Sequence, residues 1–81
     1  MRVRTKALEG EAVTWDGTNA DELAALAGSS WEGTHASSAL VRSREGELIH
    51  VRPGWIVSRW YGIAGVIISS PGGWAWAEEA A

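Results

Sequence analysis

Apolar and polar residues alternate in short runs along most of this chain, with the period of two that is typical of β-strands. Residues 2–6 read Arg-Val-Arg-Thr-Lys and predict an edge strand, whose charged side chains disfavour pairing of its open edge with another chain. Residues 11–15 predict a second, half-buried strand, because Val13 and Trp15 fall on one face. An Asp-Gly pair follows directly, and its turn chemistry ends this strand.

One helix is predicted after that turn. Thr18 or Asn19 is its N-cap, and Thr18 has the capping-box spacing to Asp21, with Asp in place of the favoured Glu or Gln. Gly28 supplies the left-handed residue that ends the helix. A helix this short does not persist alone, so its apolar stripe must pack against the sheet. The stripe consists of Leu23, Leu26 and Ala27.

The middle of the chain predicts a loop followed by a β-hairpin. Residues 29–38 are rich in Gly and Ser around Trp31 and His35, and they predict a loop without a regular period, the most mobile part of the chain. Residues 39–44 and 47–52 then predict the two strands of the hairpin, because each run alternates apolar and polar side chains.

The sequence allows two registers for this hairpin. A two-residue turn at Glu45-Gly46 would put arginines on the same face as the apolar residues of the second strand. A three-residue loop over residues 44–46, with Gly46 left-handed in a bulge, is favoured because it buries the β-branched residues together. One face then carries Val41, Ile49 and Val51, and the other carries Leu40, Arg42, Leu48, His50 and Arg52.

Proline and glycine mark the limits of the remaining strands. Pro53-Gly54 makes a tight corner that begins a strand over residues 55–60. Residues 66–68 read Val-Ile-Ile, a run expected of a strand that is covered on both faces or lies at the centre of the sheet. Residues 74–77, Trp-Ala-Trp-Ala, predict either a last strand or one helical turn, before a solvated end.

These elements predict one α+β domain over residues 1–81: a small, twisted, mainly antiparallel sheet or half-open barrel with one short helix packed on it. A chain of 81 residues has only a small core, and it contains no cysteine for disulfides. It has six Trp, one Tyr and no Phe, and six Trp side chains are more than a small core easily buries. Since Trp is enriched at contact surfaces and small folds gain stability by association, we expect a homo-oligomer.

The charge and the N-terminal sequence exclude several classes of protein. The formal net charge is −3, which is neither the excess of Lys and Arg of a nucleic-acid-binding protein nor the acidity of a DNA mimic. No apolar run follows the charges of residues 2–6, so neither a secretory signal nor a membrane anchor is expected. The sequence predicts a protein of the cytoplasm that binds no membrane.

The side chains that carry catalysis or bind metals are few and scattered. His35 and His50, without Cys or a nearby acidic cluster, do not supply the four ligands usual for zinc. Asp16 lies in a turn and Asp21 at a helix start, and no Gly-X-Ser-X-Gly elbow supports a nucleophile. Residues 69–73 lack the Lys of a phosphate-binding P-loop. The sequence therefore predicts no enzyme, no metal site and no cofactor.

One constellation suggests a binding site on the predicted hairpin. Guanidinium groups bind phosphates in bidentate fashion and Trp stacks on bases, so arginines beside a Trp could hold a nucleotide or a short single strand. The candidate residues are Arg42, His50, Arg52, Arg59, Trp60 and Trp74. A solvated polar face, with Leu40 and Leu48 covered by a neighbour, is the simpler interpretation and the one we favour.

Three motifs occur in the order found in a family of small tailed-phage proteins of unknown function. Residues 11–15 read Glu-Ala-Val-Thr-Trp, residues 45–47 read Glu-Gly-Glu, and residues 52–57 read Arg-Pro-Gly-Trp-Ile-Val. They resemble the family's Glu-Ala-Val-Gln-Trp, Glu-Gly-Asp and Ser-Pro-Gly-Asp-Trp-Ile, although the Asp after Pro-Gly is missing here. The resemblance implies a phage gene expressed in the host cytoplasm, and it brings no catalytic or ligand-binding residue.

The sequence and this resemblance together predict a small phage accessory protein that acts by binding rather than by catalysis. It is expected to form a homo-oligomer and to have a host or phage protein as its target. A module that binds or sequesters a nucleotide is the first alternative, and a minor structural component of the virion is the second.

Overall fold

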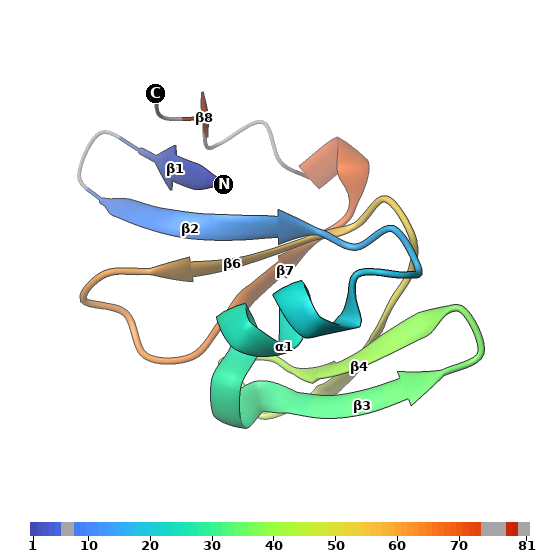
Figure 1. Ribbon diagram of the computed structural model, residues 1–81. Helices are drawn as coiled ribbons and strands as arrows, with labels where there is room; N and C mark the ends of the chain where they lie inside the picture. Colours follow the sequence, from blue (N-terminus) through green and yellow to red (C-terminus); the bar gives the residue numbers. More distant parts are fainter. Residues whose placement is uncertain (6–7, 74–77, 80–81) are drawn as a thin grey trace.

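The computed structural model describes residues 1–5, 8–73 and 78–79 (Figure 1). The predicted last strand or helical turn at residues 74–77 lies outside the described residues. The elements in chain order are β1 (Arg2–Arg4), β2 (Glu9–Thr14), α1 (Ala20–Ala27), β3 (Trp31–His35), β4 (Ser38–Arg42), β5 (Leu48–Val51), β6 (Ile56–Trp60), β7 (Ile67–Ser69) and β8 (Glu78–Glu79), with short 3-10 helices at Gly28–Ser30 and Pro71–Gly73.

The strands form two antiparallel sheets. Sheet A has five strands in the order β7-β6-β2-β1-β8, and sheet B has three in the order β3-β4-β5. Sheet A is open, with β7 and β8 at its two edges, so it is not a closed barrel. The predicted α+β class, with antiparallel strands and one short helix, is confirmed. Within the described part of the chain, no helix has the length and apolar character needed to span a membrane.

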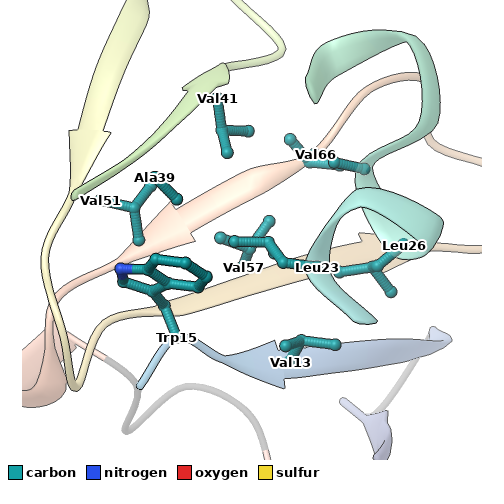
Figure 2. Close-up of a cluster of buried hydrophobic side chains, with 10 residues drawn as sticks. Val13, Trp15, Leu23, Leu26, Ala39, Val41, Val51, Val57 and Val66 are labelled. Carbon is teal, nitrogen blue, oxygen red and sulfur yellow. The ribbon is translucent and has the colours of Figure 1, made fainter. Parts of the chain in front are cut away.

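Helix α1 and sheet B pack on the same face of sheet A, and the main core lies between them (Figure 2). Trp15, directly after β2, is 1% exposed and joins the layers. Its indole Nε1 donates a hydrogen bond of 2.9 Å to the carbonyl oxygen of Ser37, in the turn between β3 and β4. The same core cluster contains side chains from both sheets and the helix: Val13, Leu23, Leu26, Ala39, Val41, Val51, Val57 and Val66.

The opposite face of sheet A carries a second apolar cluster, centred on Trp60. This side chain is 2% exposed, and its Nε1 donates to Ser58 Oγ at 2.9 Å. The Ser58 hydroxyl in turn donates to the carbonyl oxygen of Ile67 at 3.3 Å. Gly10 lies beneath the indole, where an added Cβ would meet Trp60 Cε3 at 3.1 Å and the Arg59 carbonyl oxygen still closer. Trp60 is therefore a core residue of sheet A.

The favoured register of the β4–β5 hairpin is confirmed. The Ser43 N–H donates to the Glu47 carbonyl oxygen at 2.8 Å, and the three residues between them form the loop. Gly46, the last of these, has a φ of 90°, which a side chain would strain. Val41 lies opposite Ile49 on the face turned toward the core.

The prediction that residues 29–38 form an irregular loop is wrong. They contain β3, which pairs with β4 along most of its length and ends in a two-residue turn where Ala36 has a φ of 54°. The register shifts between Trp31 and Gly33, so the strand does not keep a strict period of two. Tertiary contacts, including the half-buried Trp31 side chain, stabilise a segment whose Gly and Ser content alone favours a loop.

Two strand positions in sheet A also differ from the prediction. The first strand, β1, is not at an edge, because it lies between β2 and β8. Conversely, β7 is at the edge and not at the centre. Its two isoleucines, Ile67 and Ile68, lie opposite Ser58 and Val57 on alternate faces, and both are partly buried. The other expectation for this run, cover on both faces, is therefore correct in part.

The start of α1 is organised by Asp16 rather than by the predicted capping box. Asn19 is the N-cap residue, but its side chain makes no capping hydrogen bond. Asp16 Oδ1 accepts hydrogen bonds from the Thr18 hydroxyl and N–H, both at 2.7 Å, and from the Asn19 N–H at 3.0 Å. These bonds, that of the Thr18 hydroxyl foremost, hold the pKa of the Asp16 carboxyl below its ordinary value of 3.8. Thr18 is thus engaged by Asp16 and not by Asp21.

Candidate functional site

The outer face of sheet B, the face turned away from the core, brings together some of the predicted binding residues. Leu40 lies opposite His50 and Arg42 lies opposite Leu48, so these four side chains share the face. Leu48 is 42% exposed. Arg52 is exposed directly after β5. The face also includes Glu32 and His35, which come from β3.

The contribution of β3 to this face was missed at the sequence level. His35 on β3 and His50 on β5 meet across β4, with ring centroids 6.4 Å apart and an interplanar angle of 79°. Such an edge-to-face arrangement is favourable for aromatic rings. The sequence carried no periodic signal for it, because the register shift between Trp31 and Gly33 puts Trp31 on the core side and His35 on the outer face.

Arg42 is already engaged within the protein. Its Nε lies 3.3 Å from Glu32 Oε2, and its Nη1 donates to the Gly46 carbonyl oxygen at 2.9 Å. Both charged side chains of the ion pair are more than two-fifths exposed, so the pair adds little to stability. The outer face presents a positive and a negative group side by side. A phosphate approaching Arg42 would have to compete with the Glu32 carboxylate.

Arg59 caps the C-terminus of α1 and lies on sheet A, apart from the outer face of sheet B. Its Nε donates to the Leu26 carbonyl oxygen and its Nη2 to that of Ala27, each at 2.7 Å. Gly28 ends the helix with a φ of 57°, which favours glycine, but its ψ of −123° is not that of the predicted left-handed cap. A guanidinium at this position satisfies two orphan carbonyls and complements the negative end of the helix dipole.

The six candidate residues do not form one site among the described residues. Arg42, His50 and Arg52 lie on or beside the outer face of sheet B, whereas Arg59 and Trp60 have structural positions in sheet A. Trp74 lies outside the described residues. Within the described residues, no group of three His, Asp or Glu side chains is placed to hold a metal ion.

A cleft of about 320 Å³ lies where the core between the two sheets opens to solvent. Its polar wall comes from the end of the β4–β5 hairpin, and its apolar wall includes Trp55 and β7. Ser43 lines this cleft, and its Oγ is a buried side-chain oxygen with no hydrogen-bond partner among the described residues. Leaving such a group unpaired costs about 1–3 kcal/mol, so a partner for it would be stabilising.

A second hollow, of about 340 Å³, lies between α1 and the strands β1 and β2. Arg2, Glu11 and Glu22 contribute charges of both signs to its lining.

Comparisons of the chain with protein-family models, with curated proteins and with solved structures gave no match.

Proposed function

We propose that this protein is a small binding module that contacts a protein partner, in the first instance a second copy of itself, through the outer face of sheet B. The observation that carries the proposal is the arrangement of that face. The exposed Leu48 and the half-buried Leu40 lie among polar side chains that can form a rim. An apolar centre with a polar rim is the usual anatomy of a protein interface.

The charges of the outer face suit a second copy. Arg42 and Glu32 lie side by side, so two copies related by a two-fold axis can exchange partners and pair each guanidinium with the opposite carboxylate. The His35 and His50 rings add flat contact surface beside the leucines. A small core without disulfides gives such an association a stabilising role as well.

We propose further, from the resemblance of the three motifs to tailed-phage proteins, that the module acts in the host cytoplasm with a host or phage protein as its target. Nucleotide binding is the less supported function, because the Arg42 guanidinium already bonds to Glu32 and Gly46 and the Arg59 guanidinium to α1. A place in the virion would require the protein to be found in purified particles.

Sedimentation velocity at increasing protein concentration tests the contact surface. Leu48→Glu puts a charge at the centre of the outer face and should abolish association that the parent protein shows. Tyr61→Glu is the matched control, because Tyr61 is 58% exposed but follows β6 in sheet A. The proposal is wrong if the parent stays monomeric, or if both substitutions weaken association equally.

A further inference from the structure

The cleft between the β4–β5 hairpin and β7 has the features of a small-molecule site. Its floor is formed by Ile49, Trp55 and Ile68, which pack against the main core but are only partly buried. Val66, next to them, is fully buried and fixes the bottom of the cleft. A volume of about 320 Å³ is at the lower end of the range for ligand pockets and admits a molecule of one or two rings.

The cleft is preformed, because its two walls are bonded to each other. The Arg44 N–H donates to the Val66 carbonyl oxygen at 3.1 Å and so ties the hairpin of sheet B to the segment before β7. Gly65, with a φ of 81°, lets the hairpin and the segment before β7 approach closely, because a Cβ at residue 65 would lie 2.9 Å from Arg44 Cβ. A ligand would enter this space without first opening it.

The polar groups of the cleft gather at its hairpin end. Ser43 Oγ is buried without a partner, whereas the buried Ser58 hydroxyl in the same protein makes two hydrogen bonds. Ser43 is among the residues that line the cleft, so an occupant would lie beside it. Arg44, Glu45 and Glu47 complete the rim, and two carboxylates against one guanidinium leave it negative.

We propose that this cleft binds a small organic cation: a protonated amine carried on an apolar body of one or two rings. The rings would cover the partly buried Ile49, Trp55 and Ile68, while the ammonium donates hydrogen bonds to Ser43 Oγ and to a rim carboxylate. The Trp55 indole in the wall adds a face that attracts cations. The site is separate from the outer face of sheet B and does not depend on it.

Amide chemical shifts in the 81-residue protein test the proposal with three probes that share one ring: phenethylamine, 2-phenylethanol and phenylacetate. Phenethylamine should cause saturable shifts at Ser43, Ile49 and Ile68, and phenylacetate should bind at least several-fold more weakly. Equal affinity for the amine and the carboxylate, or no saturable shift at these amides with any probe, would overturn the proposal.

Two variants separate a binding role from a structural one. Ser43→Ala removes an unpaired hydroxyl, so the protein should be as stable as its parent or more so, yet bind phenethylamine about two- to five-fold more weakly. The loss for 2-phenylethanol should be smaller, because its neutral hydroxyl makes a weaker hydrogen bond than an ammonium. Glu45→Gln with Glu47→Gln should reduce the preference for the amine over the alcohol. Unchanged amine affinity in both variants would show that these groups do not recognise a ligand. Self-association, measured in parallel, should not change.

Discussion

Replacing Arg59 by Gln should destabilise the fold, because the guanidinium closes the C-terminal end of α1. Gln cannot reproduce the two bonds of 2.7 Å to the carbonyl oxygens of Leu26 and Ala27, and it removes the charge that faces the helix end. Hydrogen bonds of a charged group contribute about 1.5–3 kcal/mol each. Since Arg59 is only half-buried and water replaces part of this, we expect a total loss of about 2–3 kcal/mol.

The loss should be plain in both urea and thermal unfolding. Each 1 kcal/mol lowers the melting temperature of a domain of this size by roughly 4–8 °C, so the expected fall is about 10–20 °C. Far-UV circular dichroism and Trp fluorescence should report the same transition, because the helix and the indoles belong to one fold. Arg59→Lys should lie between the parent and Arg59→Gln, since an ammonium keeps the charge but lacks the planar fork that reaches both carbonyls.

Arg52→Gln is the matched control, because it removes an exposed arginine directly after β5 and should change the free energy of unfolding by less than about 0.5 kcal/mol. If Arg59→Gln and Arg52→Gln unfold at the same urea concentration, the capping role of Arg59 is refuted. Its guanidinium would then be free for the ligand-binding role that the sequence suggested.

Three further outcomes follow from contacts elsewhere in the fold. Gly10→Ala should cost about 3 kcal/mol in urea unfolding, because its Cβ collides with the neighbouring strand under Trp60; a loss below about 0.5 kcal/mol would contradict that packing. Trp15→Phe should lower the urea midpoint by the equivalent of about 1–3 kcal/mol, since it removes the bond to the Ser37 carbonyl, and an unchanged midpoint would argue against this bond. Asp16→Asn should be less stable than the parent at neutral pH, and the difference should shrink as the pH falls below 3.8. The reason is that a carboxyl with a lowered pKa stabilises the fold only while it is ionised. Thermal melts in which the difference does not depend on pH would contradict this.

Local patterns predicted the parts of this fold that local forces decide. The register of the β4–β5 hairpin followed from the period of two and from one left-handed glycine, Gly46. The end of α1 followed from Gly28. Both depend on side chains within a few positions of one another, so a single sequence contains the necessary information.

Contacts between distant positions decided the rest. Arg59 reaches carbonyls 32 and 33 positions earlier in the chain, and no periodicity shows that pairing. Trp60 could be assigned to a core only once β6 was known to lie between β2 and β7. Sheet B covers sheet A on one face only, and this decides which face of the hairpin is exposed and leaves the cleft at the open end of the core. The pairing of β3 likewise depends on β4 and not on its own composition.

The most direct test of the account is a series of amide spectra recorded at increasing concentrations of the parent protein. If the outer face of sheet B is the contact surface, the resonances of Leu40, Leu48 and His50 should shift or broaden with concentration, while those of Val3 and Val13 in sheet A stay constant. Spectra that do not change with concentration, or changes confined to sheet A, would contradict the proposal that this protein associates through sheet B.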